Sequence, residues 1–308
     1  MKIIHPKRKY MRTIYAVGVT AAMLFAGALS VSAEALAATD EPAVLYTAAA
    51  VYEGQATVEK RLGVGVTVNG AAYQGTAFLY NETTYIGIRQ FSMLLGANSV
   101  EWEAESKTAT VEAETLSLSA RYGSNYLIAN GRYLWIENGV IIENGTMYVP
   151  IRVLCQAFGY GVVWEDSTKT AVVNKTGGPI VSGAYYYDAD SVYWLSRIIN
   201  AEATGESLRG KIAVGNVVLN RKNSTLFPNT IYGVIFDTKN GVQFTPIANG
   251  AIYNIPTEES IIAAKLCLEG VNLLPHALFF VNEKIATSSW VTDNREYIAA
   301  IGNHKFFA

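Results

Sequence analysis

The sequence predicts an α+β protein in which a strand-rich N-terminal half is followed by a helix-rich C-terminal half. The first half contains a repeated unit of alternating apolar and polar residues around a short apolar segment, which is typical of strands and a helix. The second half contains apolar residues at helical spacing. Residues 174–184 interrupt both patterns with glycine, proline and small polar residues, so they are expected to be a linker between two domains.

The first 37 residues have the pattern of an export signal. Five basic residues within the first 12 positions precede an almost uncharged apolar run, residues 14–31. Ala35 and Ala37 place small side chains at the two positions that a signal peptidase reads. We therefore expect residues 1–37 to be removed and the protein to be secreted. The alternative is a retained membrane anchor, because the apolar run approaches the length that spans a bilayer.

The chain that remains is acidic. Removing residues 1–37 takes away five of the 24 basic residues and one of the 26 acidic residues, which leaves 19 against 25 and a net charge of about −6. Nucleic acids bind basic surfaces, so we expect no nucleic acid partner. The same charge argues against tight electrostatic docking to anionic wall polymers.

Two short motifs anchor each unit of the N-terminal repeat. Tyr85–Arg89 (YIGIR) recurs as Tyr148–Arg152 (YVPIR), and Trp102–Ala109 recurs as Trp164–Ala171. A short apolar segment that ends at a glycine lies between the two motifs in both copies. Each unit is therefore expected to form a strand, a helix and a hairpin of two strands, with the helix buried against a small antiparallel sheet.

Residues 38–173, with their two repeats, resemble the stalk-like N-terminal domain of copper amine oxidases, and the match is best over Met147–Val173. The name implies no copper here, because a copper site needs clustered His ligands and the chain has only His5, His276 and His304. The sequence also lacks HExxH and CxxC motifs. We therefore expect no metal and no cofactor, and we interpret this half as a spacer or as a module that associates with the cell wall or spore coat.

One acidic residue of the second half lies on an apolar helical face. Leu195 and Ile198 follow helical spacing, and Glu202 continues the same stripe four residues after Ile198. A carboxyl group buried there holds its proton unusually well, as a general acid near neutral pH must. Gly205 is expected to end the helix, so that the carboxyl group lies where the helix opens into a loop. The alternative is that Glu202 bends out into solvent.

A series of segments in the second half carries a family resemblance. The segments are Asn200–Glu206, Ala213–Arg221 (AVGNVVLNR), Phe227–Ile231 (FPNTI), Gln243–Gly250 (QFTPIANG) and Ile301–Phe306 (IGNHKF). In this order and spacing, residues 185–308 resemble the SleB/CwlJ-type cell wall hydrolases, the spore cortex-lytic enzyme family. The resemblance implies a helix-rich, lysozyme- or transglycosylase-like catalytic domain with a small β component.

The resemblance also implies a function, the cleavage of the MurNAc–GlcNAc bond in peptidoglycan glycan strands of the cell wall or spore cortex. A lytic transglycosylase needs one acid/base, here Glu202, because the muramic acid's own C6 hydroxyl attacks the anomeric carbon. A muramidase-type hydrolase needs a second carboxylate, which Glu206 or Asp237 would supply. Gly205 is expected to turn Glu206 away, toward the surface. A non-catalytic wall-binding protein is the third interpretation.

Five residues are candidates for substrate binding, each with a structural alternative. By the resemblance, Gln243 and Phe244 line the saccharide groove, where an amide can bond an N-acetyl group and a ring can pack on a sugar face. Arg295 can meet a carboxylate of a peptide stem, or it forms a salt bridge. His304 is a proton carrier or a structural histidine. Glu206 is a second acid or a capping residue.

Two expectations concern helix ends. Asp190 or Ser191 is the expected N-cap of the helix that carries Glu202. Asn220 and Arg221 are interpreted as a structural cap at the end of the next helix, because they follow its apolar stretch.

Overall fold

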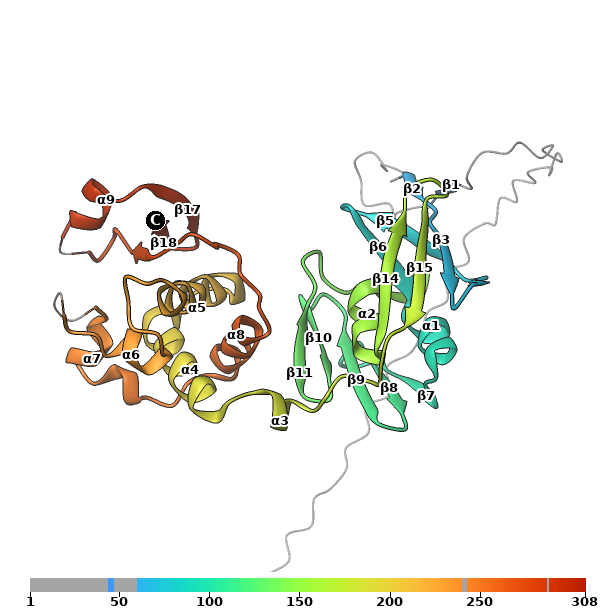
Figure 1. Ribbon diagram of the computed structural model, residues 1–308, viewed down its shortest axis with the longest axis horizontal. Helices are drawn as coiled ribbons and strands as arrows, with labels where there is room; N and C mark the ends of the chain where they lie inside the picture. Colours follow the sequence, from blue (N-terminus) through green and yellow to red (C-terminus); the bar gives the residue numbers. More distant parts are fainter. Residues whose placement is uncertain (1–43, 47–59, 240–242, 287) are drawn as a thin grey trace, which may run out of the picture. The chain divides into compact units, whose positions relative to one another are not determined.

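The computed structural model describes residues 44–46, 60–239, 243–286 and 288–308. It confirms the α+β class, with a strand-rich first half and a helical second half that ends in a small sheet (Figure 1). The predicted export signal, residues 1–37, lies outside the described residues. None of the helices within the described ranges is both long and apolar enough to cross a membrane.

The N-terminal half consists of short strands and two eight-residue helices. The helices are α1 (Ile88–Leu95) and α2 (Ile151–Phe158). The strands are β1 (Val44–Tyr46), β2 (Lys60–Leu62), β3 (Gly65–Val68), β4 (Ala71–Ala72), β5 (Ala77–Tyr80), β6 (Thr83–Gly87), β7 (Ser99–Glu103), β8 (Thr108–Ala113), β9 (Leu116–Arg121), β10 (Tyr126–Ala129), β11 (Arg132–Trp135), β12 (Ile141–Glu143), β13 (Thr146–Pro150), β14 (Tyr160–Glu165) and β15 (Thr170–Lys175).

The two sequence repeats fold as the same unit, β6–α1–β7–β8 in the first copy and β13–α2–β14–β15 in the second. Their first strands pair antiparallel at the centre of a sheet with the order β12-β13-β6-β5, where Val149 lies opposite Ile86. Both residues are fully buried, so the two YxxIR motifs are central to the core of this half. The hairpins separate into different sheets, because β7–β8 pairs with β9 whereas β15 pairs in parallel with β3.

Both repeat helices end at a glycine in the left-handed conformation, Gly96 at φ 107° and Gly159 at φ 79°. At Gly159 a side chain is also excluded by space, since a Cβ there would lie 2.0 Å from the carbonyl oxygen of Gly178. Glycine is therefore required for two independent reasons at the end of α2.

The C-terminal half is built from helices and one three-stranded antiparallel sheet with the order β16-β18-β17. The helices are α3 (Gly183–Tyr186), α4 (Ala189–Ala203), α5 (Leu208–Asn223), α6 (Ile231–Ile235), α7 (Thr245–Ala248), the 3₁₀ helix η1 (Ala251–Tyr253), α8 (Glu258–Leu268) and α9 (Trp290–Asn294), and the strands are β16 (Phe279–Val281), β17 (Tyr297–Ile301) and β18 (His304–Phe307). Helices α4, α5 and α8 pack against one another in pairs (Figure 1).

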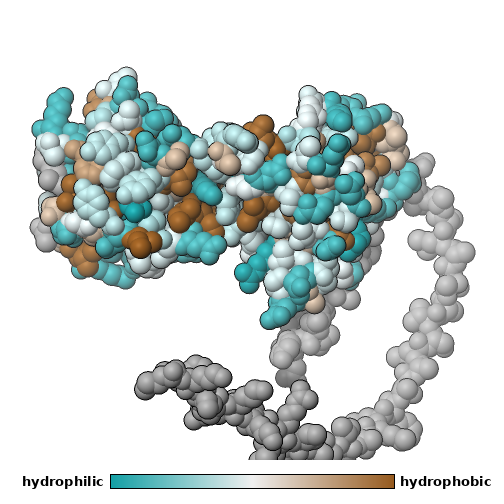
Figure 2. Space-filling view, turned by 90° about the horizontal axis from the view of Figure 1, so that it is seen from below, coloured by the Kyte–Doolittle hydropathy of each residue, from teal (hydrophilic) through white to brown (hydrophobic). Residues whose placement is uncertain are grey.

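Each half buries its own apolar side chains. The buried cluster of the first half lies between Val66 and Val173, and the clusters of the second half lie between Leu195 and Phe306. On the face seen in Figure 2, hydrophobic residues form small patches interspersed with hydrophilic ones. The hydrophobic effect therefore stabilises each half.

Helix α4 begins at Ala189, earlier than either of its expected caps, Asp190 and Ser191, allows. Asp188 is the N-cap, and its carboxylate accepts a hydrogen bond from the backbone N–H of Ser191 at 2.8 Å. The prediction of Asp190 or Ser191 was therefore wrong, because both residues lie inside the first helical turn. Asp190 there complements the positive end of the helix dipole.

Helix α5 is the central helix of the second half. Its residues from Gly210 to Val218 are all buried. Gly215 lies where α5 meets α4 and α8, because a Cβ at this position would come within 2.7 Å of the Cys267 sulfur and 2.8 Å of the Ile199 Cδ1 atom. The absence of a side chain lets the three helices approach closely.

We predict that Gly215→Ala lowers the free energy of unfolding by up to about 2 kcal/mol. Overpacking costs about 1–3 kcal/mol, and the better helix propensity of alanine offsets up to about 1 kcal/mol. Urea unfolding monitored by circular dichroism measures the change. Gly205→Ala is the control, since nothing lies within 4 Å of a Cβ there. Equal stabilities for the two variants would contradict the close packing at Gly215.

Candidate active site

Glu202 is the penultimate residue of α4 and lies on its buried face, as the helical spacing predicts. Leu195, Ile198 and Ile199 on this face are fully buried, and so is the neighbouring Ala203. Beyond it, the hydroxyl of Thr204 bonds back to a carbonyl of the last helical turn and closes the helix end. The carboxyl group is therefore placed at the end of a rigid, well-packed helix.

The environment of Glu202 favours its protonated form. Burial raises the pKa of this carboxyl group from 4.5 to about 7, and the positive charge of Arg221 offsets part of the increase. Within the described ranges, no side chain or backbone group forms a hydrogen bond or ion pair with the carboxyl group. Glu202 thus has the pKa that a general acid requires near neutral pH.

Arg221 provides a buried positive charge next to this acid. The residue is 5% exposed, its Nε donates a 2.7 Å hydrogen bond to the carbonyl of Leu278, and its Nη1 atom has no partner among the described residues. The guanidinium carbon lies 5.0 Å from the ring centre of Phe227 and 5.2 Å from those of Phe244 and Phe279. Burial lowers the pKa of Arg221 to about 10, while the charges of Asp237 and Glu202 act in the opposite direction. Arg221 therefore remains charged at neutral pH.

The interpretation of Asn220 and Arg221 as a helix cap was wrong, because α5 continues to Asn223. Instead, Asn220 donates to the carbonyls of Leu274 and Ala277, at 2.8 and 2.9 Å. One helical turn earlier, Asn216 donates to the carbonyl of Val271. With Arg221 on Leu278, the polar face of α5 binds the backbone that leads into β16. The sequence signal was an Asn repeated at four-residue spacing in an otherwise apolar helix.

Glu206 contacts Asn303 and His304 of the C-terminal hairpin rather than Arg221. Its side chain is only 7% exposed, and Asn303 occupies both carboxylate oxygens, with a backbone N–H at 3.1 Å and a side-chain amide at 2.8 Å. Burial alone would raise the pKa of Glu206, but the bonds from Asn303 and the charges of His304 and Lys211 lower it overall. The expectation of a surface or substrate-binding Glu206 was wrong, because the carboxylate fastens the C-terminal hairpin to the α4–α5 turn. The same oxygens require Gly302, where a Cβ would lie 1.8 Å from Oε2.

Two other predicted binding residues are buried. His304 is 5% exposed, its ring packs edge-on against Phe280 at 5.3 Å, and burial lowers its pKa while Glu206 acts in the opposite direction. Phe244 is 2% exposed and faces Arg221 and Phe280. The structure corrects both assignments, because neither side chain offers a surface to a saccharide.

Arg295 and Gln243 remain predicted binding residues. The Arg295 guanidinium lies 4.3 Å from the ring centre of Phe279 and 5.1 Å from that of Trp290, which is 51% exposed. Phe279 thus lies between Arg295 and the buried Arg221. Gln243 is half-buried and directly follows residues 240–242, which the structure does not describe.

Comparison with known families agrees with this architecture. Residues 205–307 match the family model described as cell wall hydrolase, and residues 67–173 match the one described as copper amine oxidase N-terminal domain. The second half of this chain is a cell wall hydrolase domain. Glu202 lies just before the matched range, on the helix that leads into it.

The chain is similar to enzymes of spore-forming bacteria. It is 36% identical over 148 residues to a spore cortex-lytic enzyme of Oceanobacillus iheyensis, covering 48% of this chain and 49% of the relative. It is 37% identical over 120 residues to the spore cortex-lytic enzyme of Bacillus subtilis, covering 39% and 38%. The chain therefore spans half or less of these relatives.

A solved structure shows a similarity of the same extent. The catalytic domain of the germination-specific lytic transglycosylase SleB from Bacillus anthracis is 34% identical, with a TM-score of 0.37, over 42% of this chain and 100% of that chain.

The raised pKa of Glu202 predicts a pH-dependent gain of stability in Glu202→Gln. A carboxyl group with a pKa of 4.5 when unfolded and about 7 when folded contributes full stability below pH 4.5 and loses it as the pH rises through 7. The neutral amide has no such loss. The variant should match the wild type at pH 4 and exceed its free energy of unfolding by up to about 3 kcal/mol at pH 8. Urea unfolding at both pH values tests this, and a constant difference would contradict it.

Removing the Arg221 charge should raise the pKa of Glu202 further. In Arg221→Met the carboxyl group loses the one cation that lowers its pKa, so its NMR titration midpoint moves to higher pH. The ¹³C resonance of the Glu202 carboxyl carbon, assigned by its loss in Glu202→Gln, gives the midpoint. Arg221→Lys should remain near the wild type, and Lys222→Met is the control for removal of a neighbouring charge. If the Glu202 titration midpoint were unchanged in a folded Arg221→Met variant, the proposed electrostatic effect of Arg221 on Glu202 would be excluded.

Proposed function

We propose that this protein is an exported peptidoglycan-cleaving enzyme, and specifically a lytic transglycosylase that uses Glu202 as its acid and base. The observation that carries the proposal is a half-buried carboxyl group at the end of a well-packed helix, with a pKa of about 7 and no partner within the described ranges. The cell wall hydrolase match and the names of the relatives support peptidoglycan as the substrate.

The chemistry follows from one residue in two protonation states. Protonated Glu202 gives its proton to the glycosidic oxygen as the bond to the anomeric carbon breaks. The carboxylate that forms is stabilised by the charge of Arg221, because that charge is fixed before the reaction starts. The carboxylate then accepts the proton of the muramic acid's C6 hydroxyl as its oxygen bonds to the anomeric carbon. A 1,6-anhydro end results, Glu202 is protonated again, and no water is consumed.

A muramidase-type hydrolase is the second candidate, with Asp237 as the acid that would activate water. Glu206 is not available for this role, since Asn303 occupies both of its oxygens. Asp237 is half-buried and close enough to Arg221 to raise the pKa of that residue. A hydrolase would use Asp237, whose charge acts on the same guanidinium group as the charge of Glu202.

The N-terminal half is proposed to hold the enzyme at its substrate. It matches the copper amine oxidase N-terminal domain, and it contains a buried apolar cluster of its own. We propose that this half associates with the cell wall or spore coat and raises the local concentration of glycan strands. A wholly non-catalytic wall-binding protein is less well supported, because it gives no reason for the uncompensated burial of Glu202.

We expect Glu202→Gln to lower the rate of glycan cleavage by at least about 10²-fold, because the amide has no proton to transfer. Sacculi digested with the purified protein and analysed by mass spectrometry should give 1,6-anhydro ends, which are lighter by one water than hydrolysed ends. Glu206→Gln is the matched control, and its rate per folded molecule should stay close to that of the wild type.

The same digests separate the alternatives. Reducing ends, together with an inactive Asp237→Asn variant, would replace the transglycosylase with the hydrolase. Near-normal cleavage by folded Glu202→Gln would remove the central assignment.

A further inference from the structure

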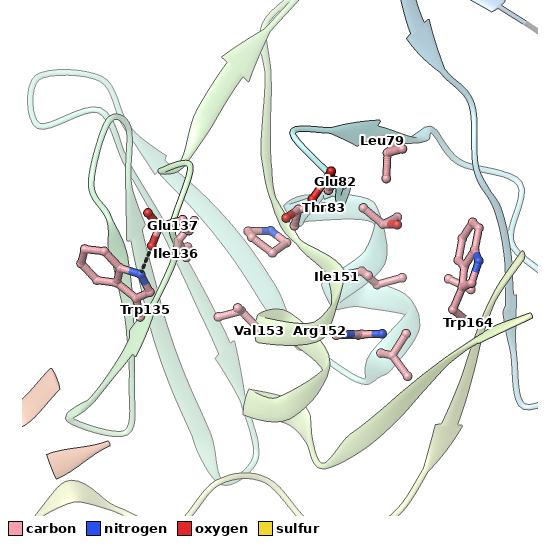
Figure 3. A pocket seen from close by; sticks show the side chains of 14 residues that line it. Leu79, Glu82, Thr83, Trp135, Ile136, Glu137, Ile151, Arg152, Val153 and Trp164 are labelled. Atoms are coloured by element: carbon pink, nitrogen blue, oxygen red, sulfur yellow. Dashed lines mark hydrogen bonds between the residues drawn. The ribbon is translucent and has the colours of Figure 1, made fainter. Parts of the chain in front are cut away.

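The N-terminal half contains a cavity of about 560 Å³, within the usual size range of small-ligand sites. The first repeat contributes the turn between β5 and β6, and the second contributes the start of α2 and the inner face of β14 (Figure 3). Residues 135–137 close another side. All lining residues belong to this half, so the cavity is not part of the site around Glu202.

The walls of the cavity are largely apolar. Leu79, Ile151 and Val153 line it, together with the indole of Trp164. The indole N–H donates to Asp166 at 3.0 Å, which fixes the ring. Such walls can hold the aliphatic part of a ligand.

Three charged side chains line the cavity, and two of them, Glu82 and Arg152, have opposite charges and no ion-pair partner among the described residues. Figure 3 shows Glu82 and Arg152 on different sides of it. Among the described residues, neither side chain has a hydrogen bond, an ion pair or a ring contact. By contrast, Glu137 of the same lining accepts the indole N–H of Trp135 at 2.8 Å.

Glu82 occupies a position where the backbone favours glycine. It is the second residue of the two-residue β5–β6 turn, at φ 60°. Three other hairpins of the described part have Asn followed by glycine at this position, Gly70, Gly131 and Gly145, with φ between 73° and 82°. Gly145 corresponds to Glu82 in the second repeat. A glutamate in the left-handed conformation costs about 1–2 kcal/mol, so its carboxylate is retained at the expense of stability.

Arg152 differs from the equivalent arginine of the first repeat in its hydrogen bonding. Its counterpart in the first copy, Arg89, donates a hydrogen bond of 2.6 Å to the carbonyl of Val100. Arg89 is therefore used to hold the fold, whereas Arg152 is left unpaired at the cavity. The two copies differ in residue type at Glu82 and in the bonding of the arginine at Arg152, and both side chains line one cavity.

We propose that this cavity binds a short peptide with a free carboxylate and a free ammonium group, as in the stem peptides of peptidoglycan. Arg152 binds the carboxylate, Glu82 binds the ammonium group, and Ile151 and Trp164 contact the aliphatic part between them. Charges of both signs favour this ligand over a neutral saccharide. The proposal rests on the proposed action on peptidoglycan, and it identifies the wall-associating site of the N-terminal half.

Calorimetry with the full chain carrying Glu202→Gln tests the proposal without cleavage. The probe is the tripeptide L-alanyl-γ-D-glutamyl-diaminopimelate, and chitotetraose is the saccharide comparison. We expect the tripeptide to bind, and Arg152→Met and Glu82→Gly each to weaken binding at least about tenfold. Arg121→Met, which removes an exposed arginine outside the cavity, should leave binding unchanged.

Two further measurements separate binding from folding. Glu82→Gly should raise the urea midpoint while it weakens binding, since it restores the residue that the turn favours. Acetylation of both amino groups of the tripeptide should weaken its binding to the chain that carries only Glu202→Gln. It should have little further effect on binding to the Glu82→Gly variant. Absence of tripeptide binding, stronger binding of chitotetraose, or an unaltered affinity in both cavity variants would overturn the proposal. Glycan cleavage is measured separately on the wild type. Failure of the proposed enzyme activity is therefore distinguishable from failure of tripeptide binding.

Discussion

The packing of α4 against α5 is the constraint on which the candidate site depends, because it holds the helix that carries Glu202, whose carboxyl group has no direct partner among the described residues. A cation in contact with this carboxyl group would lower its pKa below the range of a useful acid. Arg221 is instead held by the Leu278 carbonyl and surrounded by three aromatic rings. From there it moderates the pKa of Glu202 and leaves it at about 7. Close helix packing at Gly215 and the fixed guanidinium group together set the chemistry of one residue.

Two glutamates that are close in the sequence, Glu202 on α4 and Glu206 in the α4–α5 turn, have opposite properties in this arrangement. The pKa of Glu202 is raised because burial is its main influence, whereas the pKa of Glu206 is lowered because Asn303 bonds both of its oxygens. When the environments of two carboxyl groups move their pKa values apart in this way, the group with the raised pKa is the candidate acid, and the group with the lowered pKa remains an ionised structural residue. The glutamate that has no partner has the features of an acid catalyst, and the other secures the C-terminal hairpin.

The sequence predicted what local patterns encode. The apolar stripe that ends at Glu202 and the strand–helix–hairpin units at the two YxxIR motifs follow from the local order of residues, and both are present in the structure. Apart from the N-cap of α4, which is Asp188, the errors concern partners that are distant in the sequence. Glu206 finds Asn303 at a separation of 97 residues, and Asn220 finds Leu274 at 54. A helical pattern shows which face of α5 is polar, but it does not show that this face binds the backbone leading to β16.

The repeat also explains how a binding site can arise within a structural domain. The central pairing of β6 with β13 buries equivalent residues of both copies, so the YxxIR motifs are constrained wherever they contribute to the core. Positions at the rim are under no such constraint, and there the copies differ. Arg89 is bonded to a backbone carbonyl while Arg152 is not, and Gly145 keeps the favoured turn residue while Glu82 does not. Duplication thus supplies the same fold twice, and each copy has one charged side chain at the cavity that forms no ion pair among the described residues.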